Sequence, residues 1–155
     1  IDQSKGTLKV IEVGGGYGRL AEIFQHTIPG KIKYFLIDAV PTSLFLAYEY
    51  LNIALPNHKI GSFYENQNLM DLDLDIYILP SWRSDLLPRE YFDLAINIQS
   101  MQEMDKHYID FYMELFNKTL ITEEGLIYLC NRRDHIYKGS WDFPKTGGAY
   151  KTQIP

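Results

Sequence analysis

The residues best suited to chemistry form a glycine-rich segment near the start of the chain, Glu12-Val13-Gly14-Gly15-Gly16-Tyr17-Gly18. Glycine permits positive φ angles and lets a ligand approach the backbone closely. An apolar run precedes the segment and a helical pattern follows it, so unpaired N–H groups and the positive end of a helix dipole lie next to it. The segment therefore predicts a strand-to-helix turn that binds a carboxylate or a pyrophosphate.

Two classes of cofactor fit such a turn. Gly16, Gly18 and Ala21 can be aligned with the dinucleotide fingerprint G-x-G-x-x-G/A, with Asp38 twenty residues beyond Gly18, and this keeps an NAD-type oxidoreductase as an alternative. Glu12 argues against a dinucleotide, because its carboxylate would lie beside a pyrophosphate of the same sign. A carboxylate there suits a zwitterionic ligand, since it can help to hold an ammonium group. The balance favours S-adenosylmethionine (SAM).

The motif Glu12-x-Gly14-x-Gly16-x-Gly18 resembles the E/D-x-G-x-G-x-G first motif of class I SAM-dependent methyltransferases. The resemblance continues at Asp38, which ends Tyr34-Phe35-Leu36-Ile37-Asp38, and at Tyr91-Phe92-Asp93-Leu94-Ala95-Ile96-Asn97, which is similar to the FDLV strand of that family. It covers residues 8–130 in order and spacing. The resemblance implies SAM as the cofactor, with Asp38 accepting hydrogen bonds from the ribose hydroxyls.

A second stretch, Asn97-Ile98-Gln99-Ser100-Met101-Gln102-Glu103-Met104, is similar to sugar O-methyltransferases. The similarity implies that a hydroxyl of a sugar or similar small molecule accepts the methyl group. Glu103 falls where many relatives carry a His, which makes it the first candidate for the general base, and Gln102 is a candidate for orienting the acceptor. His107 can reach the same site if that segment is helical, and His135 is a further candidate.

The resemblance also predicts the cofactor contacts. The adenine site of the family follows the third strand, where Pro80-Ser81-Trp82-Arg83-Ser84-Asp85 offers Trp82 or Asp85. The full set of expected cofactor-binding residues is Glu12, Gly14, Gly16, Gly18, Asp38, Trp82, Asp85, Asn97 and Gln99. Asp105 with His107 or His135 could contribute to a metal site, but no spacing requires one, and no metal is assigned.

Five short apolar runs must position these residues. They show little alternation between polar and apolar residues, which is typical of parallel strands buried on both faces. The runs are Leu8–Val13, Ile32–Ile37, Asp75–Leu79, Phe92–Ile98 and Gly125–Cys130. Residues 57–73 have no clear period and are expected to form a loop.

Helical patterns fall between the runs. The first begins at Arg19, the second follows Thr42 as N-cap and ends before Pro56, and the third has Asp105 as N-cap. Their expected inward positions are Leu20, Ile23 and Phe24; Leu44, Tyr48, Leu51 and Leu55; and Ile109, Met113, Phe116 and Leu120. The alternation predicts one α/β domain over residues 1–155, with a Rossmann-like, doubly wound, mostly parallel sheet of order 3-2-1-4-5. Ligand is expected at the carboxyl ends of the strands, where the order reverses.

Composition narrows the partners. The net charge is −5 and the fifteen basic residues are scattered, which argues against binding to nucleic acid. No run approaches the ~20 apolar residues of a membrane span, so a cytoplasmic protein is expected. The single cysteine, Cys130, lies in an apolar run and is expected to be a buried, inert thiol.

The ends of the chain suggest a domain cut on both sides, because it begins almost on the first strand and ends soon after the fifth. Only the tail after Cys130 could supply the antiparallel edge that full family members carry. An incomplete edge could pair with a second subunit, so a homo-oligomer and a non-catalytic SAM-binding module are kept as alternatives to a complete enzyme.

Overall fold

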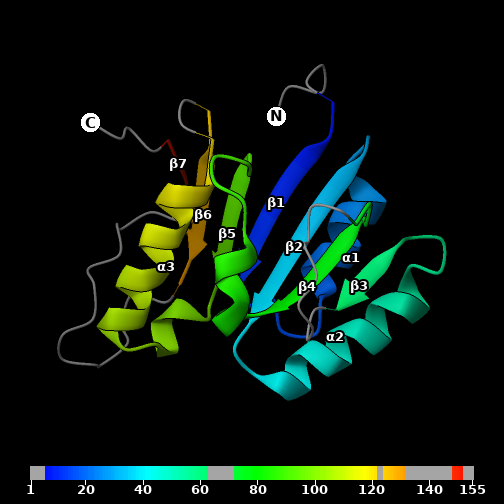
Figure 1. Cartoon of the computed structure of the whole chain (residues 1–155), viewed down its shortest axis with the longest axis horizontal. Helices are drawn as coiled ribbons and strands as arrows, with labels where there is room; N and C mark the ends of the chain where they lie inside the picture. Colours follow the sequence, from blue (N-terminus) through cyan, green and yellow to red (C-terminus); the bar gives the residue numbers. More distant parts are fainter. Residues whose placement is uncertain (1–5, 63–71, 122–123, 132–147, 152–155) are drawn as a thin grey trace.

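The computed structural model describes residues 6–62, 72–121, 124–131 and 148–151. Within these ranges the chain forms one seven-stranded sheet of order β3-β4-β2-β1-β5-β6-β7 with helices packed against it (Figure 1). The strands are β1 (Leu8–Val13), β2 (Ile32–Asp38), β3 (Ile60–Ser62), β4 (Ile76–Pro80), β5 (Leu94–Ile98), β6 (Leu126–Cys130) and β7 (Gly148–Lys151). The helices are α1 (Arg19–Thr27), α2 (Pro41–Ala54) and α3 (Lys106–Thr119), with 3₁₀ segments η3 (Ser81–Leu86) and η4 (Met101–Glu103).

The predicted strand order is confirmed. The five expected strands are β1, β2, β4, β5 and β6, and their order in the sheet is 3-2-1-4-5. All pairs among them are parallel, whereas β7 pairs with β6 in the antiparallel direction. The tail after Cys130 therefore does supply an antiparallel edge.

The expectation of a loop over residues 57–73 was wrong at Ile60–Ser62. These residues form the short strand β3, in which Ile60 lies opposite Ile76 of β4. A three-residue strand is too short to show a period, so only its pairing with β4 reveals it.

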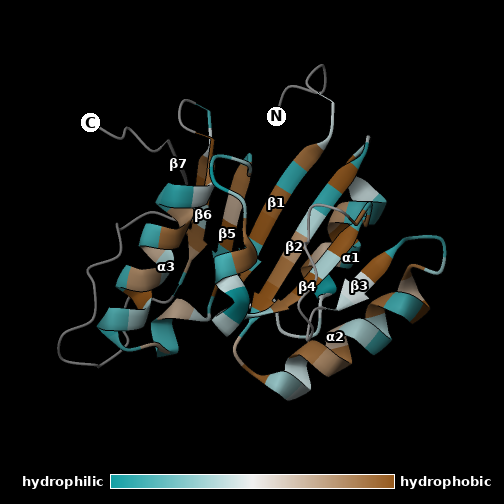
Figure 2. Cartoon of the chain, in the orientation of Figure 1, coloured by the Kyte–Doolittle hydropathy of each residue, from teal (hydrophilic) through white to brown (hydrophobic). Residues whose placement is uncertain are grey.

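Two hydrophobic layers explain why the strands show so little alternation. On one face, Ile11 and Phe35 pack with Phe116 of α3. On the other face, Val10 and Leu36 pack with residues of α1 and α2. Both sides of β1 and β2 are thus buried. Each fully buried large side chain contributes about 1.5–3 kcal/mol to the stability of the fold. Figure 2 shows the apolar strands between helices that carry both polar and apolar residues.

The helices depart from the expected faces at several residues. In α1 the buried residue is Ala21, whereas Ile23 is 39% exposed, so its inward placement was wrong. In α2 the apolar stripe passes through Ala47, and Tyr48 is 37% exposed. The small side chain of Ala47 allows the helix to approach the sheet closely, which the larger ring of Tyr48 would prevent.

The N-terminus of α2 also differs from the expectation. Val40 is the N-cap and Pro41 takes the first helical position, so Thr42 lies inside the first turn. Proline suits that position because its fixed φ is helical and its missing N–H has no intrahelical partner there. The expected N-cap of α3 is confirmed at Asp105, which has extended backbone angles.

Cys130 is only half-buried, which corrects the expectation of a buried thiol.

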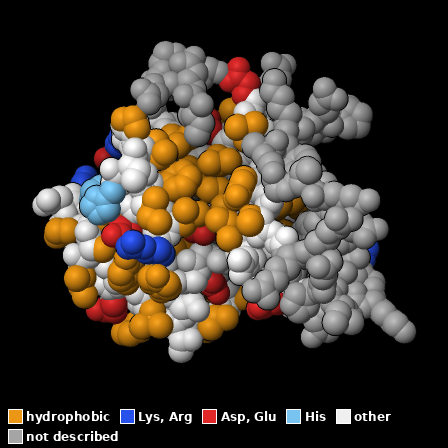
Figure 3. Space-filling view, turned by 180° about the vertical axis from the view of Figure 1, so that it is seen from behind, with side chains coloured by type: hydrophobic (Ala, Val, Ile, Leu, Met, Phe, Trp, Pro, Cys, Tyr) orange, Lys and Arg blue, Asp and Glu red, His pale blue; other side chains and the backbone are white. Residues whose placement is uncertain are grey.

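Hydrophobic side chains gather at the centre of the face that points away from the viewer in Figure 1 (Figure 3). Among the described helices, none is both long enough and apolar enough to cross a membrane.

Candidate cofactor site

The glycine-rich turn joins the carboxyl end of β1 to the start of α1. The N–H groups of Gly14 and Gly15 donate to the carbonyl oxygen of Ile37 at 2.8 and 3.3 Å, which ties the turn to the end of β2. The φ angles of Gly14, Gly16 and Gly18 are 78°, 54° and 91°. Left-handed backbone at three positions in one short turn explains the spacing of the glycines, since other residues adopt it only with strain.

The three glycines have different surroundings. A Cβ atom on Gly14 would lie 2.1 Å from Oγ of Ser100, and one on Gly18 would lie 2.8 Å from Cδ1 of Leu51. A Cβ atom on Gly16 would meet no described atom within 4 Å. Gly14 and Gly18 are therefore required by packing inside the protein, whereas the backbone at Gly16 borders open space that a ligand can enter.

Asp38 ends β2 directly beside this open space. Its Oδ2 accepts a hydrogen bond from the N–H of Gly16 at 3.0 Å, and its Oδ1 accepts one from the N–H of Val40 at 2.9 Å. Each carboxylate oxygen can accept more than one hydrogen bond. The side chain thus holds the turn in place and retains acceptor capacity for a ligand hydroxyl.

Glu12 lies beneath the turn rather than in front of it. Its side chain is 4% exposed, and Oε2 accepts a hydrogen bond from the hydroxyl of Tyr34 at 2.9 Å. Burial raises the pKa of Glu12 to about 7, the Tyr34 hydrogen bond opposes this rise, and the charge of Asp38 adds to it. Because β1 and β2 are parallel with Val13 opposite Ile37, Glu12 and Asp38 both lie near the carboxyl ends of neighbouring strands.

Asn97, at the carboxyl end of β5, is fully buried and uses all the hydrogen-bonding capacity of its amide. Nδ2 donates to the carbonyl of Val13 at 2.9 Å and to Oγ of Ser100 at 2.5 Å. Oδ1 accepts from the N–H of Met101 at 3.3 Å and from Nδ2 of Asn131 at 3.0 Å. Asn97 is therefore a support of the turn and of the following loop, placed behind the surface that a ligand would touch.

The expected catalytic residues follow Asn97 along the chain. Gln99 is exposed and has a φ of 61°, an uncommon angle for a residue other than glycine. Glu103 ends η4 and His107 lies in the first turn of α3, and both are exposed. The ring of His107 packs on Tyr108, with the ring centroids 3.9 Å apart. His135 lies outside the described residues.

The expected adenine-site residues lie in η3, directly after β4. Trp82 is 58% exposed, and Asp85 is an exposed residue with its Oδ1 3.6 Å from Nε of Arg83. Because β4 runs parallel to β2 and its Pro80 is opposite Asp38, η3 begins at the edge of the sheet that carries the glycine turn. The structure thus brings Asp38 and the start of η3 to one edge.

Sequence reasoning missed Tyr112 of α3. Its ring is buried, and its hydroxyl lies near Ser81 at the start of η3. Burial raises the pKa of Tyr112, the interaction with Ser81 lowers it, and the charge of Asp38 raises it. Tyr112 lies three residues after Ile109, a spacing that would have placed it on the inward face of the helix.

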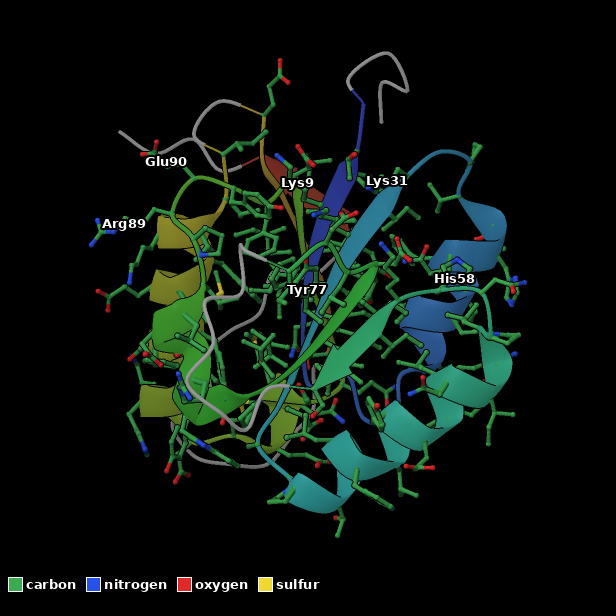
Figure 4. The ribbon with its side chains drawn as sticks, turned by 45° about the vertical axis from the view of Figure 1, so that its right-hand side comes forward. Lys9, Lys31, His58, Tyr77, Arg89 and Glu90 are labelled. Carbon is green, nitrogen blue, oxygen red and sulfur yellow. The ribbon has the colours of Figure 1, made fainter. Side chains whose placement is uncertain are left out.

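A separate group of charged residues lies at the opposite end of the sheet, where the strands begin. The Nζ atoms of Lys31 and Lys33 lie 3.3 and 3.4 Å from Oδ1 of Asp73, and Nζ of Lys59 lies 3.7 Å from its Oδ2. Figure 4 shows Lys9 and Lys31 at this end, where the strands begin. Within the described residues, no group of three His, Cys, Asp or Glu side chains could hold a metal ion.

The sequence matches no protein-family model, and no curated protein matches it. Solved structures do match. A SAM-dependent methyltransferase from Aquifex aeolicus matches with a TM-score of 0.59 and 16% sequence identity. The match covers 86% of this chain and 61% of the Aquifex chain. Phosphoethanolamine N-methyltransferase 2 of Haemonchus contortus, in complex with SAM, matches with a TM-score of 0.54 and 14% sequence identity. This match covers 81% of this chain and 24% of the Haemonchus chain.

The [4+2]-cyclase SpnF has a TM-score of 0.56 and 18% identity, covering 80% of this chain and 38% of its own. The same fold thus also occurs in a protein described as a cyclase. The chain spans 29%, 48% and 24% of the lengths of the first three structures it matches. Taken with the sheet order and the glycine turn, these likenesses show that the chain has the fold of the class I SAM-dependent methyltransferases.

Proposed function

We propose that this chain is the cofactor-binding core of a SAM-dependent methyltransferase. The observation that carries the proposal is the open space beside Gly16, which is bordered by the carboxylate of Asp38. A nucleoside with free hydroxyls suits that carboxylate, because charge-assisted hydrogen bonds are stronger than neutral ones. The fold likeness to SAM-dependent methyltransferases supports the same ligand.

The remaining parts of the site are proposed to contact different parts of the cofactor. The turn and the N-terminus of α1 suit the carboxylate of the amino-acid part, through backbone N–H groups and the helix dipole. Glu12 lies directly beneath the turn, and its pKa of about 7 leaves the carboxyl partly protonated at neutral pH. An ammonium group bound nearby would favour its ionised form. Trp82 and Asp85 of η3 are proposed to contact the adenine, and Gln99, two residues beyond Asn97, is proposed as a further cofactor contact.

We further propose that the acceptor is a hydroxyl of a sugar or similar small molecule. When bound, SAM supplies a methyl group on a sulfonium sulfur, so the protein must only align the acceptor and remove its proton. Glu103 is exposed at the end of η4 and is proposed to accept that proton, with Gln102 orienting the acceptor and His107 as the alternative base. The proposed setting is the cytoplasm, with a second copy of the chain as a candidate partner.

Calorimetric titration tests the cofactor. S-adenosylhomocysteine (SAH) is expected to bind and NADH is not, whereas binding of NADH alone would replace this proposal with the oxidoreductase alternative. Failure of both ligands to bind would contradict the proposal outright.

A coupled assay for SAH release then tests the reaction on a panel of sugars, with phosphoethanolamine as an amine acceptor for comparison. We expect release with a sugar and its loss, by 10²-fold or more, in Glu103→Gln. Binding of SAH without release on any acceptor would favour the non-catalytic module.

A further inference from the structure

The end of β6 holds the loop that carries the proposed acceptor residues. The carbonyl of Cys130 accepts a hydrogen bond from the N–H of Gln99 at 2.8 Å. One residue later, Oδ1 of Asn131 accepts one from the N–H of Gln102 at 3.2 Å. The loop is thus fixed at two points by a strand that is remote in the sequence.

Asn131 has only one orientation that satisfies its surroundings. Its Nδ2 donates to Oδ1 of Asn97 at 3.0 Å, while its Oδ1 faces the N–H of Gln102. Exchanging the two ends of the amide would place oxygen against oxygen and N–H against N–H. Because Asn97 in turn donates to the carbonyl of Val13, the hydrogen bonds run without interruption across the ends of β1, β5 and β6.

The loop that these contacts hold is strained. The φ of 61° at Gln99 costs a residue with a Cβ atom about 1 kcal/mol or more. Such a conformation persists only where surrounding contacts impose it. The bonds from Cys130 and Asn131 on either side of Ser100 contribute to this, together with the bonds of Asn97 to Ser100 and Met101.

We infer that Asn131 is a positioning residue for methyl transfer, which sets the conformation of the loop Gln99–Glu103 and thereby the place of Gln102 and Glu103. It acts on the acceptor side, through the backbone of Gln102, and its hydrogen bonds among the described residues go to Gln102 and Asn97. The inference rests on the proposed function for the role of the loop, but the hydrogen bond itself can be tested in the free protein.

The test compares Asn131→Asp and Asn131→Ala with the wild-type chain. Asn131→Asp preserves shape but places a carboxylate oxygen against Oδ1 of Asn97. Asn117→Asp, on the exposed surface of α3, makes the same change in charge and is the control. The measurement is amide hydrogen exchange by NMR, with melting temperature recorded to show that each variant is folded.

In the cofactor-free protein at neutral pH, protection of the Gln102 amide is expected to fall about tenfold in Asn131→Ala, which removes its acceptor. The fall is expected to be smaller in Asn131→Asp, whose carboxylate still accepts that N–H but repels Oδ1 of Asn97. Protection at Gly14, which bonds to Ile37, is expected to stay as in the wild type. Lowering the pH should restore protection in Asn131→Asp alone, because the protonated carboxyl can again donate to Asn97. Unchanged protection of Gln102 in both variants would overturn the inference.

Titration with SAH separates this inference from the proposed function. We expect the SAH affinity of Asn131→Asp to stay within about twofold of wild type, because the hydrogen bonds found for Asn131 lead to Gln102 and Asn97 and not to the turn itself. A parallel loss of affinity and loop protection would show that Asn131 supports the cofactor turn, which also overturns the inference. Absence of SAH binding to the wild-type chain contradicts the proposed function, while the exchange comparison still decides the role of Asn131.

Discussion

The N–H of Gly16 donates to Oδ2 of Asp38 across 3.0 Å, and this contact joins the turn after β1 to the end of β2. The two residues are 22 positions apart, and the parallel pairing of β1 with β2 brings them together. The carboxylate that holds the turn is also the group that borders its open space. Asp38 therefore both fixes the conformation of the turn and supplies the carboxylate beside the proposed site.

Asp38→Asn is expected to lower the affinity for SAH by about 10- to 100-fold, because hydrogen bonds to a charged acceptor contribute about 1.5–3 kcal/mol. Titration calorimetry measures the change. Asp75→Asn is a matched control, since Oδ2 of Asp75 also accepts a backbone N–H, from Lys59 at 2.9 Å, but before the start of β4. Equal affinities in the wild type and Asp38→Asn would contradict the ribose role.

Gly16→Ala is expected to weaken SAH binding at least tenfold while the chain remains folded. The new methyl group would stand in the open space where the ligand is proposed to lie. The left-handed φ costs about 1 kcal/mol, so only a small fall in melting temperature is expected. Gly30→Ala is the control, because Gly30 has a φ of 101° and open surroundings but lies before the start of β2; similar binding in both variants would refute the placement.

Gly14→Ala is expected to act on stability instead. Its Cβ would lie 2.1 Å from Oγ and 2.4 Å from Cβ of Ser100, so the turn and the loop after β5 must separate. Overpacking of this kind costs about 1–3 kcal/mol, which urea denaturation can measure. Combining it with Ser100→Gly should recover part of the loss, whereas strictly additive losses would show that the two residues do not meet.

The raised pKa of Glu12 predicts that the free energy of unfolding depends on pH. Its folded-state pKa of about 7 lies above the ordinary value of 4.5, so the folded chain holds the proton more tightly than the unfolded chain does. This contribution is fully present below pH 4.5 and is lost as the pH rises to about 7, for a total of about 3 kcal/mol.

Glu12→Gln cannot ionise and can still accept the hydrogen bond from Tyr34. It is expected to lose this component of the pH dependence and to be more stable than the wild type at pH 8. Urea denaturation at several pH values between 4 and 8 makes the comparison. If both chains lose stability with the same slope across that range, the buried carboxyl is not the titrating group.

The sequence alone determined the architecture and the place of the turn. Five apolar runs with helical patterns between them predict a parallel sheet, and parallel strands bring their carboxyl ends to one edge. The glycines and Asp38 are therefore assigned to the same end of the sheet by the residue order alone. These inferences depend on local periodicity and on topology, which a single chain carries in its residue order.

Only the tertiary structure decided what stands behind the turn. The burial of Glu12 against Tyr34, the closeness of Gly14 to Ser100, and the bond from Asn131 to Asn97 join residues from different strands. No period links such residues, because their contacts depend on the packing of side chains across neighbouring strands. For the same reason the short strand β3 became visible only through its pairing with β4 in the folded chain.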